Sequence, residues 1–118
     1  MVARYDSLPQ GEVAASVASY EEQLRGRLAV IRQAKTPEEF AVAYLRLREM
    51  QEFFCSLTLL DFDLNGARIY VSLRQAHRRA DAMDLRIAAT ALAHDITLVT
   101  NNTQDFIAIA NLRLENWA

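Results

Sequence analysis

Glycine and cysteine are scarce in this 118-residue chain, and each shortage argues against a class of function. Its three glycines, Gly11, Gly26 and Gly66, nearly rule out a glycine-rich loop that cradles a nucleotide phosphate. A single cysteine cannot form an internal disulfide or a zinc-binding cysteine cluster. Because Cys55 stands between aromatic and aliphatic neighbours, we expect it to be a small buried residue.

Long apolar runs are also missing. No stretch approaches the roughly 20 apolar residues that a membrane-crossing helix needs. The first residues lack the apolar core of a signal peptide, and one unpaired cysteine suits a reducing compartment. We therefore expect a soluble, cytoplasmic protein that has no membrane partner.

Neither sign of charge dominates the chain. Lys and Arg total 13 against 15 for Asp and Glu, so the net charge of −2 gives no overall attraction to polyanions. Any contact with nucleic acid must come from a local patch. Every basic residue except Lys35 is arginine, a fork that suits phosphate and carboxylate, although a GC-rich genome explains the same bias.

The apolar patterning predicts one α/β domain over residues 1–118, with residues 1–11 as an irregular lead-in. Strands alternate with helices, which implies a mostly parallel sheet with right-handed crossovers. The expected strands span 12–17, 57–62, 97–100 and 112–117; the expected helices span 19–33, 36–55, 64–79 and 81–94, with a short helix or turn over 103–109.

Capping residues mark the expected helix starts. Ser19, Thr36, Asp63 and Asp81 are the predicted N-caps. On the second helix, an apolar face made of Phe40, Ala43, Tyr44, Leu47, Gln51 and Phe54 should lie against the rest of the fold.

Three acids occupy comparable places in successive strand–helix units. Glu22 falls early in the first helix, Asp84 heads the alanine-rich helix, and Asp105 follows the strand over 97–100. Strand ends and the helix starts that follow them meet at one edge of a parallel sheet, so the three carboxylates can meet. Such oxygen ligands favour Mg²⁺ or Mn²⁺.

Each acid also has a purely structural explanation. Glu22 is three residues after Ser19 and fits a capping box. Asp84 suits the positive end of a helix dipole, although the nearby Asp81 should repel it unless a cation lies between them. Asp105 fits an Asx-type turn.

Arginines near these acids form a candidate phosphate-binding face, with ordinary solvated helix surface as the alternative. They are Arg25, Arg27, Arg74, Arg78, Arg79 and Arg86. His77 and His94 lack the spacing of metal ligands. Trp117 is expected to be a packing residue rather than a platform for base stacking.

From residue 12 to the end, the chain resembles the PIN domain family, in particular the VapC toxin ribonucleases of bacterial toxin–antitoxin systems. The motifs that carry the resemblance are SYEEQLRG (19–26), MDLRIAA (83–89), LVTNNTQDF (98–106) and LRLENW (112–117). The resemblance implies a three-layer α/β/α fold and Mg²⁺-dependent hydrolysis of RNA. It carries metal-binding acids over to Glu22, Asp84 and Asp105, with Asn102 orienting Asp105 or a ligand water.

The chain departs from the family at its beginning. The family opens with a central strand that ends in the first metal-binding aspartate, and nothing before residue 12 resembles it. Asp6 aligns poorly with that acid, so the resemblance implies an N-terminally truncated fold of weak or no activity. The neighbouring strands then need a new partner, from re-pairing of the sheet, from the lead-in, or from a second copy.

The resemblance also implies partners: an RNA substrate, with tRNA among the candidates, an antitoxin protein, and a second copy in a homodimer or larger oligomer. A competing hypothesis is a catalytically degenerate PIN scaffold that uses its first two helices to dimerise and bind an antitoxin or another protein. A third is an α/β domain whose acidic pocket has another use.

Overall fold

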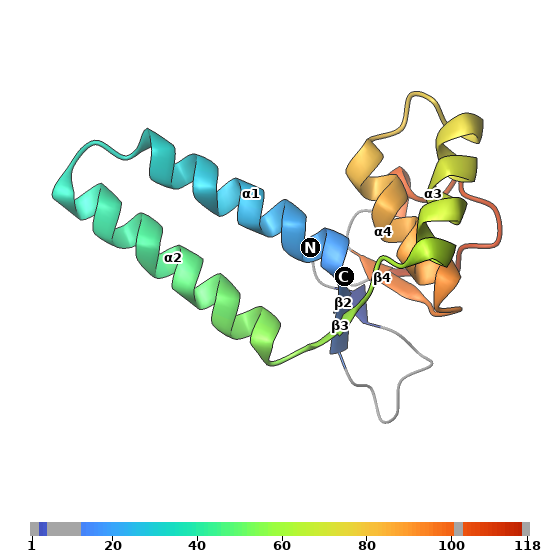
Figure 1. The fold of residues 1–118 in the computed structure, drawn as a ribbon, viewed down its shortest axis with the longest axis horizontal. Helices are drawn as coiled ribbons and strands as arrows, with labels where there is room; N and C mark the ends of the chain where they lie inside the picture. Colours follow the sequence, from blue (N-terminus) through green and yellow to red (C-terminus); the bar gives the residue numbers. More distant parts are fainter. Residues whose placement is uncertain (1–2, 5–12, 101–102, 117–118) are drawn as a thin grey trace.

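The structure is a computed structural model, and it describes residues 3–4, 13–100 and 103–116. Helices α1 (Val17–Gln33) and α2 (Pro37–Cys55) form a long hairpin, here called the helical arm. The arm extends away from the strands, whereas α3 (Leu64–Ala76) and α4 (Ala82–Ala93) pack together at the opposite end (Figure 1). The molecule is accordingly elongated, with extents of 48 × 36 × 29 Å.

Two short sheets join these parts. In the first, β2 (Val13–Ser16) lies between β1 (Ala3–Arg4) and β3 (Thr58–Leu60), parallel to β3 and antiparallel to β1. In the second, β4 (Leu98–Thr100) and β5 (Leu114–Asn116) are parallel. The helix–strand alternation and the parallel pairs confirm the predicted α/β class.

The lead-in is not wholly irregular, which corrects the sequence prediction. Ala3 pairs with Ala14 and Arg4 with Val13, and β1 also lies against β4. Backbone N–H and C=O groups along β2 would otherwise lack partners on that side, so pairing with β1 stabilises the sheet. Three sources of a new strand partner were expected, and in the described residues the lead-in provides it. Asp6 and Trp117 lie outside the described residues.

Helix α1 starts one turn earlier than predicted. Ser16 is the N-cap, because its Oγ accepts a hydrogen bond from the Ser19 backbone N at 2.9 Å. The Ser16 hydroxyl also donates to Ser19 Oγ at 3.0 Å, so both serines are satisfied although buried. Glu22 therefore lies in the second turn, and the capping-box explanation of this acid is wrong.

The other three caps are confirmed. Thr36 and Glu39 form a reciprocal capping box, with Pro37 at the first helical position. Backbone N–H groups of Lys35 and Thr36 donate to the Glu39 carboxylate and hold its pKa below the ordinary value. Asp63 caps α3 and Asp81 caps α4. Helix α3 ends at Ala76, three residues before the predicted end.

The main core surrounds α4. Leu85, Ile87, Ala88 and Ala91 are almost wholly buried, together with Phe106 from the segment after η2 (Thr103–Asp105). Alanine side chains keep α4 thin, and α1, α3 and β2 all pack against it. The alanine-rich helix is therefore the centre of the fold.

A smaller core holds the base of the helical arm. Met50 and Phe54 of α2 are buried against Ala15, and Phe54 meets Tyr20 edge-to-face at 5.2 Å between ring centroids. The predicted apolar face of α2 is only partly covered, because the arm is two helices thick and leaves Phe40 and Tyr44 exposed. Cys55 is also exposed, contrary to prediction, since it stands on the outer side of the last turn.

Substitution Leu85→Ala should lower the free energy of unfolding by about 2–5 kcal/mol, because it leaves a cavity in the main core. Leu85 is 1% exposed, whereas Leu64 at the start of α3 is 65% exposed. The matched change Leu64→Ala should therefore cost less than about 1 kcal/mol. Urea unfolding of both variants checks this; similar losses would show that the core is not centred on α4.

Candidate functional site

Three different elements carry the predicted acids. Glu22 lies in the second turn of α1, Asp84 in the first turn of α4, and Asp105 at the end of η2, which follows β4. Helices α1 and α4 contact each other, and the start of α1 directly follows β2 (Figure 1). Asp105 is exposed, and the other two side chains are half-buried.

The electrostatics of Asp84 show that the other acids lie near enough to act on its charge. The pKa of the Asp84 carboxyl is raised from 3.8 to about 6, first by burial and then by the negative charges of Asp81, Asp105 and Glu22, in that order. Like charges produce such a shift only over short distances. The structure thus brings together the acids that the sequence singled out, with Asp81 as a fourth member; the four are called the acid cluster below.

Asp81 has a structural role as well. Its Oδ1 accepts a hydrogen bond from the Asp84 backbone N at 3.0 Å, which caps α4. From the sequence, Asp81 is predicted as the N-cap of this helix and as a charge that repels Asp84 unless a cation lies between them, and it is not among the predicted site residues. The sequence did indicate that Asp81 lies beside Asp84, because two acids three residues apart at a helix start face the same side.

The donor chemistry of the acid cluster suits a hard cation, since all four side chains offer carboxylate oxygens. Among the described residues, however, no three His, Cys, Asp or Glu side chains stand close enough to hold one metal ion. Mg²⁺ commonly uses one or two carboxylates and keeps several waters. The residues therefore fit a cation bound partly through water, and they do not form a closed protein cage. Asn102 lies outside the described residues.

The six candidate arginines divide into two groups. Arg25 forms an ion pair with Glu21 on α1 at 3.2 Å, and Arg27, on the same helix, has a buried Nε that finds no hydrogen-bond partner within the described part of the chain. Arg74, Arg78, Arg79 and Arg86 instead gather on α3, on α4 and on the connection between them. Arg78 and Arg79 stand on the connection that leads into Asp81, and Arg74 donates a hydrogen bond to the backbone O of Ala80 in the same connection.

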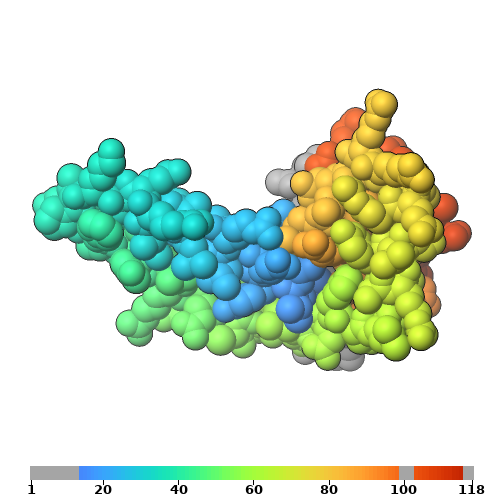
Figure 2. All heavy atoms as spheres, turned by 45° about the horizontal axis from the view of Figure 1, so that its top comes forward, coloured from blue at the N-terminus to red at the C-terminus, as the bar shows by residue number. Residues whose placement is uncertain are grey.

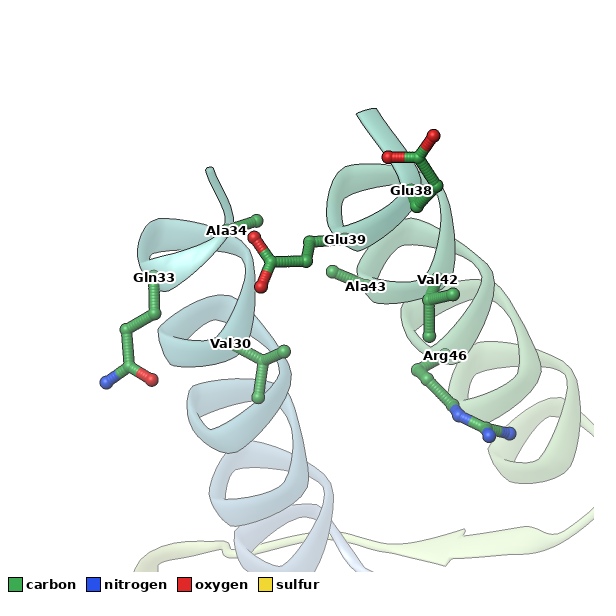
Figure 3. A pocket seen from close by; sticks show the side chains of 8 residues that line it. All are labelled: Val30, Gln33, Ala34, Glu38, Glu39, Val42, Ala43 and Arg46. Carbon is green, nitrogen blue, oxygen red and sulfur yellow. The ribbon is translucent and has the colours of Figure 1, made fainter. Parts of the chain in front are cut away.

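A separate hollow lies far from the acids, at the tip of the helical arm. It is a groove of about 480 Å³ between the end of α1 and the start of α2 (Figure 3). Val30, Ala34, Val42 and Ala43 give it an apolar lining, while Glu38, Glu39 and Arg46 supply charge. This partly apolar lining suits a segment of protein better than a phosphodiester.

A short, mostly parallel α/β sheet beside which acids from separate elements gather is the architecture of a PIN domain. The chain belongs to the PIN domain family, which it matches over residues 2–112. Within this family it is of the VapC type. The predicted family and the PIN-like α/β/α fold are thus confirmed.

Two relatives and one solved structure illustrate the similarity. Ribonuclease VapC2 of Rickettsia felis is 39% identical over 69 residues, 55% of this chain and 52% of the relative. The tRNA(fMet)-specific endonuclease VapC of Shigella flexneri is 27% identical over 116 residues, 95% of this chain and 80% of that protein. VapBC2 from Rickettsia felis, solved bound to a DNA fragment from its promoter, has a TM-score of 0.72 at 29% identity, covering 92% and 77% of the two chains.

The length of these matches differs. The match to the Rickettsia relative spans about half of that protein, whereas the Shigella match spans most of it. In the part of this chain that the structure describes, no helix has both the length and the apolar character to span a membrane.

Substitution Asp84→Asn should stabilise the fold at neutral pH by about 1 kcal/mol, since solvent screens part of the repulsion at this half-buried site. The Asp84 pKa is raised from 3.8 to about 6, so between these pH values the folded chain binds more protons than the unfolded chain. Stability therefore falls as pH rises through this window, and the gain from Asn should appear above pH 6 and vanish below about pH 4.

Thermal unfolding at several pH values measures this effect. Asp61→Asn, an exposed acid at the end of β3, is the control. A gain for Asp84→Asn that does not change with pH would contradict the crowding of charges around Asp84.

Proposed function

We propose that the protein is a metal-dependent endoribonuclease of the VapC toxin type, acting in a toxin–antitoxin system. The observation that carries the proposal is the crowding of Asp81, Asp105 and Glu22 around the half-buried Asp84. Carboxylates brought together against their mutual repulsion are typical of sites that bind cations. The relatives named ribonuclease VapC2 and tRNA(fMet)-specific endonuclease VapC support RNA as the substrate class, with tRNA among the candidates.

Glu22, Asp84 and Asp105 are the residues proposed to hold Mg²⁺ or Mn²⁺, directly or through water. A cation held there would supply activation of a water molecule and charge neutralisation at the leaving oxygen of a phosphodiester. Asp84 would give up its proton on binding the cation, because its raised pKa comes from burial and unrelieved negative charge. Asn102 is proposed to orient Asp105 or a ligand water.

We expect the reaction of the 118-residue chain to be slow. The first acid of the resembling family has no counterpart among these residues, so fewer carboxylates fix the position of the cation. A cytoplasmic location is part of the same proposal, since an RNA substrate and an antitoxin are both met there.

Cleavage of RNA in the presence of Mg²⁺ or Mn²⁺ tests the proposal. Asp84→Asn should lower the rate on the order of 100-fold, because it removes the central carboxylate of the acid cluster. Asp61→Asn should leave the rate unchanged. Single-turnover gel assays on tRNA and on unstructured RNA provide the measurement, with a chelator as blank. Equal rates for the unsubstituted chain and Asp84→Asn would remove the enzymatic function.

A second candidate is a PIN scaffold that dimerises and binds an antitoxin or another protein without cutting RNA. The helical arm favours it, since α1 and α2 expose several large apolar side chains: Leu28, Val30, Phe40, Val42, Tyr44, Leu45 and Phe53. The groove at the tip adds an apolar hollow (Figure 3). Solved VapBC complexes are similar in structure, which supports an antitoxin partner for this chain.

Substitution Val42→Asp should weaken self-association, because it places a charge in the apolar groove of the helical arm. Val71→Asp on α3 is the matched control, since the two valines are 53% and 54% exposed. Sedimentation velocity measures the oligomeric state, with dissociation expected only for Val42→Asp. An unchanged oligomer in both variants would exclude the groove from the self-association surface.

A further inference from the structure

One face of α3 carries a group of side chains for which the acid cluster gives no explanation. Tyr70, Val71, Arg74, Gln75 and Arg78 line an open hollow of about 360 Å³. Residues four apart on a helix lie one above the other, so Tyr70 and Arg74 share one face of α3, and Arg78 lines the same hollow from the turn that follows the helix. These five residues are called the arginine stripe. Figure 2 shows α3 and the connection that follows it (yellow) as exposed surface next to α4 (orange).

The stripe is basic in a chain that is acidic overall. Its lining includes two exposed arginines and no acid, although the net charge of the chain is −2. Arg79 adds another exposed guanidinium just beyond it. A local concentration of arginine attracts phosphate groups even when the whole molecule does not.

One end of the stripe reaches the acid cluster. Arg74 Nη1 donates a hydrogen bond to the backbone O of Ala80 at 2.7 Å. Ala80 directly precedes Asp81, the cap of α4 and a member of the acid cluster. A chain lying along α3 from Tyr70 toward Arg78 would therefore be led to the acids.

The aromatic ring at the other end is held in place. The Arg86 guanidinium carbon lies 5.3 Å from the centroid of the Tyr70 ring, and Phe62 contacts the same ring at 6.1 Å between centroids. Tyr70 is half-buried and packs against the main core. Tyr70 also lines the hollow, and a ring held in place loses little conformational freedom when a base stacks on its open face.

We propose that the arginine stripe binds the backbone of a single-stranded RNA and guides it into the acid cluster, an inference that rests on the proposed ribonuclease function. Arg74 and Arg78 line the same hollow and contact phosphates of the RNA backbone. Tyr70 stacks with a base, and Gln75 offers an amide to its edge. An acidic peptide would satisfy the arginines but would make less use of the aromatic ring.

RNA binding without cleavage tests the inference. The assay is fluorescence anisotropy of a short labelled single-stranded RNA with the full chain in EDTA, at several salt concentrations. The double variant Arg74→Gln/Arg78→Gln should raise the Kd about tenfold and reduce the salt slope by about 1.4, or 0.7 for each lost phosphate contact. Arg46→Gln/Arg48→Gln on α2 is the control, since it removes the same charge far from the stripe.

Two further variants guard against indirect effects. Arg78→Gln alone leaves the Arg74 hydrogen bond to Ala80 in place and should give about half of the change in salt slope. Tyr70→Phe should keep binding, whereas Tyr70→Leu should weaken it at unchanged salt slope, because stacking does not depend on counterion release.

Several results would overturn the inference. One is an equal loss of RNA affinity in the stripe and control double variants. Another is no RNA binding by the unsubstituted chain. The last is displacement of the RNA by polyglutamate as effectively as by unlabelled RNA. The last would assign the stripe to an acidic protein. Failure of the proposed function has a different signature: Asp84→Asn would cut RNA as fast as the unsubstituted chain, while the anisotropy results above would be unaffected.

Discussion

The packing of α4 is the constraint on which the rest of the structure depends. Three of its seven buried residues are alanine, and α1, α3 and β2 all pack against it. Because α1 comes this close, Glu22 lies near Asp84, and because α3 packs on the other side, its arginines reach the connection that leads into Asp81. A bulky residue at Ala88 or Ala89 would separate these elements, so the helix that forms the core also fixes the distances within the candidate site.

Repulsion within the acid cluster destabilises the folded chain. Burial and three neighbouring carboxylates raise the pKa of Asp84 to about 6, so at neutral pH the folded chain carries a repulsion that the unfolded chain lacks. Capping of α4 accounts for Asp81. A cation would relieve the repulsion, and RNA phosphates would be drawn to the neighbouring arginines. The two charged surfaces are therefore complementary parts of one proposed reaction site.

Much of the fold and of the candidate site is predictable from short local patterns in the sequence. Thr36, Asp63 and Asp81 are predictable as N-caps, because each carries a short side-chain oxygen that can accept a hydrogen bond from a backbone N–H of the first helical turn. The convergence of the acids followed from strand–helix alternation alone. Two serines three residues apart both fit the start of α1, so the pattern could not choose Ser16 over Ser19. Apolar spacing likewise cannot reveal that the helical arm is only two helices thick, which left Phe40, Tyr44 and Cys55 exposed.

Asp84 is proposed to lie within a cluster of carboxylates that binds a divalent cation. Titration of the Asp84 carboxyl carbon by NMR, with and without Mg²⁺, tests this most directly. Without the metal, the pKa should lie near 6, well above the ordinary value of 3.8. Millimolar Mg²⁺ should lower it, because the cation stabilises the charged form. A pKa near 3.8 without metal would contradict the clustering of the acids, and a raised pKa that Mg²⁺ does not move would contradict cation binding.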